Sequence, residues 1–133
     1  MAESKTKKTK ASVAAFIASV DNDTRRKDAK AVDKMYREIT GEKPAMWGPT
    51  MIGYGEWESP TGTWPRAAFS PRGANLVLYV LADYSGRDAL LKKLGKHRTG
   101  KVCLYINKLA DVDEKVLREL MKRFWKHMEA KYG

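Results

Sequence analysis

The side chains best suited to bind an anion lie in residues 95–101, which read Gly-Lys-His-Arg-Thr-Gly-Lys. The basic side chains concentrate positive charge and hydrogen-bond donors, and the two glycines allow the backbone to turn tightly. The segment matches the first part of a phosphate-binding P-loop, but Val102 stands where Ser or Thr should hold magnesium. It also leads from an expected helix into an expected strand, which reverses the order of a P-loop. We therefore expect a basic loop that either binds an anion without hydrolysing a nucleotide or is simply solvated.

Large aromatic side chains form a second candidate group, in a short stretch that is rich in glycine and proline. These rings could line a ligand slot or stack on nucleic acid bases. The alternative is that they fill a thin core beside a small sheet, where at least two should be buried for stability alone. The four residues are Trp47, Tyr54, Trp57 and Trp64.

Residues suited to metal binding or catalysis are few. Cys103, His97 and His127 are the only cysteine and histidines, and their spacing is not that of a metal site. Cys103 falls in an expected buried strand, where its thiol should be inert. Ser70 has no base beside it in the sequence, although His97 could approach it in space. We predict no metal, no cofactor and no catalytic residue, and we favour a binding protein over an enzyme.

Hydrophobic periodicity predicts the elements that must position these side chains. Residues 76–81 and 102–106 are apolar at both alternating positions, so we expect both segments to be interior strands. Gly41 should cap the second helix, and Asp111 should begin the last helix with Glu114 at capping-box spacing. The expected helices are 13–20, 21–39 or 23–39, 85–94 and 111–128, and the expected strands are 51–58, 64–69, 76–81 and 102–106.

The resulting order, ααβββαβα, predicts an α+β fold with a small, mostly antiparallel sheet and helices packed on it. The length of 133 residues suits a single domain, which we place at residues 11–133. Residues 1–10 are rich in lysine and have no apolar stripe, so we expect a flexible basic tail there.

The overall charge and composition limit the environment and the partners. A net charge of +10 favours anionic partners, although it could also serve solubility alone. A single cysteine cannot form an intramolecular disulfide, and no apolar run approaches the ~20 residues of a membrane-spanning helix. We therefore expect a cytoplasmic protein that does not bind membranes, and the sequence predicts no particular oligomeric state.

Several segments together resemble the YdhG-like family, a bacterial domain family of unknown function. The resemblance covers residues 13–127, and its most specific part surrounds Cys103. It implies a compact α+β domain in the bacterial cytoplasm, and some members are similar in shape to frataxin and have been proposed as iron carriers. The segments that carry it are Met46-Trp-Gly-Pro49, Gly53-Tyr-Gly55, Phe69-Ser-Pro-Arg72, residues 94–106 and Leu109-Ala-Asp-Val-Asp113.

These observations lead to one main hypothesis and two alternatives. The main hypothesis is a non-enzymatic binding domain for a small anionic ligand or an acidic protein surface. The alternatives are a frataxin-like iron-binding carrier and a weak nucleic-acid binder that uses the tail and the basic loop. In the main hypothesis, segments at one end of the sheet converge on a pocket. The residues predicted to form it are Trp47, Tyr54, Trp64, Ser70, Arg72, Lys96, His97 and Thr99.

Overall fold

The computed structural model describes residues 8–60, 62–73 and 75–132. They form an α+β arrangement of helices and an antiparallel sheet, in agreement with the predicted class. The helices are α1 (Val13–Ala18), α2 (Asp23–Thr40), α3 (Arg87–Leu94), the 3-10 helix η1 (Leu109–Asp111) and α4 (Glu114–Tyr132). The strands are β1 (Lys8–Thr9), β2 (Pro44–Trp47), β3 (Met51–Tyr54), β4 (Trp57–Ser59), β5 (Gly62–Trp64), β6 (Ala67–Pro71), β7 (Leu76–Tyr79), β8 (Arg98–Thr99) and β9 (Cys103–Ile106).

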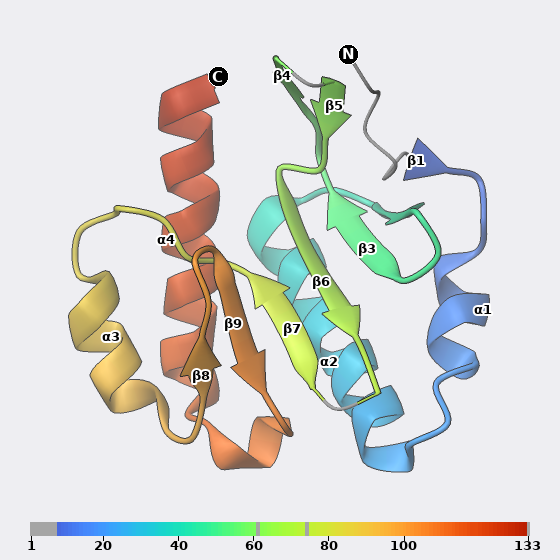
Figure 1. Cartoon of the computed structure of the whole chain (residues 1–133), viewed down its shortest axis with the longest axis horizontal. Coiled ribbons are helices and arrows are strands. Elements are labelled where there is room, and N and C mark those ends of the chain that lie inside the picture. The colour runs from blue at the N-terminus through green and yellow to red at the C-terminus, as the bar shows by residue number, and fades with distance from the viewer. Residues whose placement is uncertain (1–7, 61, 74, 133) are drawn as a thin grey trace.

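The main sheet has seven strands in the order β1-β2-β3-β6-β7-β9-β8, and each neighbouring pair is antiparallel. Helices α2 and α4 lie behind this sheet in Figure 1 and cover its back face. Within the described part of the chain, no helix lies in front of β6, β7 and β9 (Figure 1). We call this uncovered side the front face. Strands β4 and β5 form a separate two-stranded hairpin.

The core lies between the back face and the two long helices. Phe69, Leu78 and Leu104 are opposite one another on three adjacent strands and are fully buried there. Strand β7 lies between β6 and β9, and β9 lies between β7 and β8, which confirms both predicted interior strands. Residues at alternate positions, such as Ala68 and Val77, are also buried, but on the front face. On β9 the front-face residues Cys103 and Tyr105 are only partly buried, so the expectation that Cys103 is buried is not met.

Helix α2 begins and ends at residues whose types suit those positions. The Asn22 side chain accepts a hydrogen bond of 2.8 Å from the backbone N–H of Arg25. Gly41 ends the helix with φ of 71°, in the left-handed region that glycine occupies without strain, as predicted. Between these caps, Ala29, Val32 and the other buried residues face the sheet.

Helix α4 begins later than predicted. The carboxylate of Asp113, not that of Asp111, accepts a hydrogen bond of 2.9 Å from the backbone N–H of Lys115. Asp111 lies in η1, and its carbonyl oxygen accepts a hydrogen bond of 3.2 Å from the Lys96 backbone N–H. This pairing with the loop after α3 holds residue 111 outside the helix, which is a tertiary contact that the local sequence does not encode.

The middle of the chain contains more strands than predicted. The expected strand 51–58 is divided at Gly55, where φ is 67° and a Cβ atom would lie 2.8 Å from Cη2 of Trp125. The expected strand 64–69 is likewise divided between β5 and β6, and strands β1, β2 and β8 were not predicted as strands. Ala89 in α3 is exposed, and Leu94 is the residue of this helix that is buried.

The predicted flexible tail lies largely outside the described residues. Of its last residues, Lys8 and Thr9 are paired with Trp47 and Met46 as the edge strand β1. None of the described helices is both long and apolar enough to cross a membrane.

Candidate anion-binding cleft

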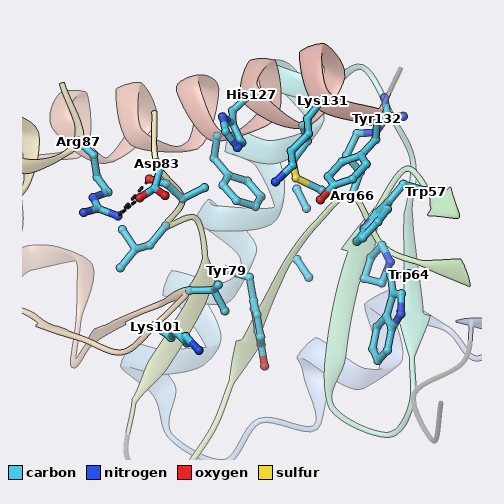
Figure 2. Close-up of a pocket in the computed structure, with 18 of the residues that line it drawn as sticks. Trp57, Trp64, Arg66, Tyr79, Asp83, Arg87, Lys101, His127, Lys131 and Tyr132 are labelled. Carbon is cyan, nitrogen blue, oxygen red and sulfur yellow. Dashed lines mark hydrogen bonds and ion pairs between the residues drawn. The ribbon is translucent and has the colours of Figure 1, made fainter. Parts of the chain in front are cut away.

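A cleft of about 650 Å³ opens at the end of the sheet where β6 begins and β7 ends. One side is the C-terminal part of α4, another is the β4–β5 hairpin, and a third is the segment after β7. Its floor reaches the turn between β8 and β9 (Figure 2). The fold therefore brings side chains from distant parts of the sequence to one concave site.

The hairpin wall is attached to α4 by aromatic rings. Trp57 in β4 is opposite Trp64 in β5, and both line the cleft. The Trp57 ring also stacks on Tyr132 at the end of α4, with ring centroids 4.1 Å apart and an interplanar angle of 26°. Figure 2 shows these three rings along one side of the cleft. The hairpin thus depends on α4 for its position.

Arg66 fixes the base of the hairpin. Its guanidinium carbon lies 5.5 Å from the centroid of the Trp125 ring, which is the geometry of a cation–π contact. Its backbone N–H donates a hydrogen bond of 3.4 Å to the carbonyl oxygen of Gly55. Because Trp125 also packs closely against Gly55, both ends of the hairpin contact the same helix residue.

The wall formed by the segment after β7 carries Asp83, which is the one acidic residue in the described lining of the cleft. Arg87 lies 3.7 Å from the carboxylate of Asp83 and donates a hydrogen bond of 3.1 Å to the carbonyl oxygen of Ala82. The Asp83 charge is therefore already balanced by a neighbouring arginine. Next to this pair in the sequence, Tyr84 has its ring centroid 6.2 Å from that of His127, and burial raises the pKa of Tyr84.

The floor of the cleft combines small, apolar and aromatic groups with one lysine. Tyr79 lies across it and accepts a hydrogen bond of 2.9 Å at its hydroxyl oxygen from Nη2 of Arg72. Burial raises the pKa of Tyr79, and the charge of Arg72 opposes this shift. Lys101 and Val102 complete the floor from the β8–β9 turn, and Val102 is 48% exposed although apolar. The floor can thus make apolar contacts with a ligand, and Lys101 provides a positive charge beside those contacts.

Positive charge exceeds negative charge at the cleft. Beyond the Asp83–Arg87 pair, the described lining includes Arg66, Lys101 and Lys131 but no second carboxylate. Figure 2 shows Lys101 and Lys131 approaching the cleft from different elements, one from the sheet side and one from α4. Such an arrangement suits a ligand that has both an apolar body and a negative charge.

Of the eight residues predicted to form the pocket, Trp64 alone lines this cleft. Tyr54 points to the back face, where it is fully buried and its ring centroid lies 4.7 Å from that of Tyr36. Its hydroxyl donates a hydrogen bond of 2.5 Å to Asp33, which also forms a salt bridge of 3.1 Å with Arg37. Burial and this hydrogen bond raise the pKa of Tyr54. The prediction that Tyr54 forms a pocket wall is therefore wrong.

Trp47 and Ser70 lie on the front face but are buried. A Cβ atom on Gly53 would lie 2.5 Å from Cδ1 of Trp47 and 2.6 Å from Cβ of Pro65, so Gly53 makes room for that ring. The Ser70 hydroxyl donates a hydrogen bond of 2.7 Å to the carbonyl oxygen of Thr50. Both side chains serve packing, which was the alternative considered for the aromatic group.

The remaining predicted residues lie at separate places, after the interior strand β6 and around the edge strand β8. Arg72 follows β6 and contacts Tyr79, whereas Thr99 lies in β8, with β9 and β7 between β8 and β6. Nδ1 of His97 lies 2.7 Å from the carbonyl oxygen of Gly95, to which it donates. Lys96 precedes it in an exposed loop. The structure therefore does not bring the eight residues into one cavity.

The sequence interpretation missed the part of the cleft formed by α4. His127 and Lys131 lie four positions apart, on one side of the helix beside the buried Phe124 and Met128. Their spacing next to the end of an apolar stripe was the available signal. The sequence interpretation placed Lys101 in the basic loop. Lys101 reaches the cleft because it lies in the turn between β8 and β9.

No group of three His, Cys, Asp or Glu side chains that could hold a metal ion occurs in residues 8–60, 62–73 and 75–132. Comparisons of the chain with protein-family models, curated proteins and solved structures found no match. The resemblance to the YdhG-like family consequently stays a prediction.

Proposed function

We propose that this protein is a binding domain without catalytic activity, and that its cleft takes a small organic anion with a flat apolar body. The observation that carries the proposal is the composition of the cleft, in which Arg66, Lys101 and Lys131 exceed the single, paired carboxylate of Asp83. Aromatic and aliphatic groups supply the rest of the lining, as in most small-ligand sites.

Two features favour an anion over a neutral apolar ligand. Lys101 and Lys131 are exposed side chains on different elements that both line the cleft, so an anion in the cleft would be attracted by both charges. Lys131 also has Nζ 5.4 Å from the centroid of the Tyr132 ring, which places its charge beside the aromatic wall. No observation on the described residues favours the iron-carrier alternative, because the carboxylates do not gather as a hard cation requires.

The test is ligand-induced stabilisation, measured by thermal unfolding and confirmed by isothermal titration calorimetry. The probes are phenyl phosphate, indole-3-carboxylate, inorganic phosphate and neutral benzyl alcohol. A ligand that binds only the folded state raises apparent stability. We expect the two aromatic anions to raise the melting temperature more than inorganic phosphate, which lacks the apolar body, and more than benzyl alcohol, which lacks the charge.

Variants then locate the site. Lys101→Ala with Lys131→Ala should abolish the stabilisation, whereas Lys92→Ala with Lys93→Ala on the exposed side of α3 should preserve it. Equal stabilisation of both double variants would place the anion elsewhere. A response to benzyl alcohol as large as that to the anions would show an apolar site with no role for the charges.

A further inference from the structure

The front face carries two tyrosines on adjacent strands. Tyr79 in β7 is opposite Cys103, and Tyr105 in β9 is opposite Val77, so the two tyrosines are diagonal neighbours on the same face. Diagonal neighbours in an antiparallel pair have separations of about 7–8 Å. Both side chains are half-buried, whereas Val77 beneath them is 1% exposed. The tyrosines therefore form part of the outer surface of this face.

An arginine accompanies each of these rings. Nη2 of Arg72 donates to the hydroxyl oxygen of Tyr79 at 2.9 Å. The guanidinium carbon of Arg98 lies 5.5 Å from the centroid of the Tyr105 ring. Both arginines are exposed, and Arg98 extends the row Tyr105, Val77 and Ser70 to the edge of the sheet. The two neighbouring rings thus each have a guanidinium group beside them.

The four strands that form this surface carry charge of one sign. Strands β6, β7, β8 and β9 contain no aspartate or glutamate. Arg72, Arg98 and Lys101 are exposed around the two tyrosines, on three different segments. A ligand that spans the face would therefore meet cations at intervals with aromatic rings between them.

We propose that the front face binds single-stranded nucleic acid, with bases stacked on Tyr79, Tyr105 and the Arg98 guanidinium and phosphates at the three cations. Unpaired bases stack on aromatic and guanidinium planes of open sheets, and basic grooves follow the phosphates. An acidic peptide would satisfy the cations but would leave the rings between them without a matching group. The inference goes beyond the cleft, because Tyr105 and Arg98 do not line it, although the two sites share Tyr79 and Lys101.

The experiment measures fluorescence anisotropy of labelled 12-nucleotide oligo(dT) and oligo(U) with the full chain at 50 and 200 mM NaCl. With three phosphate contacts, the fourfold rise in salt should weaken binding about twentyfold. Tyr105→Ala and Arg98→Ala should each weaken binding at least about fivefold, while Tyr105→Phe keeps the ring and should bind like the unaltered protein. Lys34→Ala, an exposed cation of α2, controls for the loss of one charge.

Three results would overturn the inference. One is binding of Tyr105→Ala equal to that of Tyr105→Phe, with both folded by circular dichroism. Another is equal or tighter binding of a duplex of the same length. The third is no oligonucleotide binding, whether or not a labelled poly-glutamate peptide binds in an Arg98-dependent way. Calorimetry of Tyr105→Ala with phenyl phosphate tests the cleft separately, because that binding should be unchanged.

Discussion

Trp57 and Tyr132 stack face to face at 4.1 Å, although one lies in the middle of the chain and the other at the end of α4. This contact joins the β4–β5 hairpin to the helix and thereby sets the width of the cleft between them. The cleft is consequently a product of tertiary packing and not of any local motif.

Replacing Trp57 by Ala should loosen the hairpin and weaken anion binding. The loss of the stack should cost about 0.5–1.5 kcal/mol beyond the loss of buried area. Thermal unfolding measures the first effect, and calorimetry with phenyl phosphate measures the second. Trp57→Phe is the matched control, because it keeps a ring against Tyr132. Unchanged stability in Trp57→Ala would show that the hairpin does not rely on this contact.

Leu78→Ala tests the core behind the sheet. Leu78 is fully buried in β7 between Phe69 and Leu104, so the truncation should lower the free energy of unfolding by roughly 2–5 kcal/mol. Urea denaturation followed by circular dichroism provides the measurement. Val102→Ala, at an exposed apolar position, should change stability by less than about 0.5 kcal/mol. Similar losses in the two variants would contradict the assignment of the core.

Arg25 should contribute to stability through its hydrogen bonds. Its Nη1 donates to the carbonyl oxygen of Gly73 at 2.7 Å, and its Nη2 donates to the side-chain oxygen of Asn107 at 2.9 Å. Removing charge-assisted hydrogen bonds of this kind typically costs ~1.5–3 kcal/mol each, so Arg25→Ala should be strongly destabilising. Arg25→Lys should rescue little, because an ammonium lacks the planar fork. Full rescue by lysine, measured in urea, would show that only the charge matters.

Stability should fall at alkaline pH. Burial raises the pKa of Tyr36, Tyr54 and Tyr84 above their ordinary value of 10.0. A raised pKa in the folded state stabilises the fold fully below pH 10, and this contribution is lost as pH rises further, because the unfolded chain ionises first. Each tyrosine can add up to about 1.4 kcal/mol per pH unit to the slope. Urea midpoints between pH 9 and 11 provide the measurement.

Tyr54→Phe is the matched variant for this pH dependence. It removes one ionisable group and should give a shallower loss above pH 10, even though it also removes the hydrogen bond to Asp33 and is less stable at neutral pH. A slope identical to that of the unaltered protein would mean that Tyr54 ionises as readily in the folded state as in the unfolded chain.

Lys96→Ala separates the sequence-predicted site from the cleft. Lys96 lies in the loop after α3 and does not line the cleft, whereas Lys101 does. Calorimetry with phenyl phosphate should therefore show unchanged binding for Lys96→Ala and weaker binding for Lys101→Ala. The reverse result would return the anion site to the basic loop that the sequence indicated.

The sequence predicted the parts of the fold that depend on local patterns. Interior strands β7 and β9 have apolar residues at both alternating positions, and the end of α2 has a glycine where a left-handed residue is needed. The start of α4 was misplaced because the contact between Lys96 and Asp111 is non-local. Strand 51–58 was predicted as continuous because the turn at Gly55 is set by its packing against Trp125.

The candidate site was less predictable than the fold. Tyr54 and Trp64 are both large aromatic residues with glycine or proline near them in the sequence. Strand register nevertheless turns Tyr54 towards α2, while Trp64 faces the cleft from the hairpin. His127 and Lys131 acquire their role only because the hairpin lies against that part of α4. Their spacing places both residues on one side of α4, but it does not specify what packs against that side.

The order of elements also has a consequence for synthesis on the ribosome. All seven strands of the main sheet precede α4, which begins at Glu114 and supplies Leu117, Leu120 and Met121 to the core. While the chain emerges, the strands can pair, but the part of their back face that α4 covers stays open until α4 leaves the exit tunnel. Newly made chains therefore expose apolar strands for a few seconds, which is the interval in which chaperone binding or aggregation competes with folding.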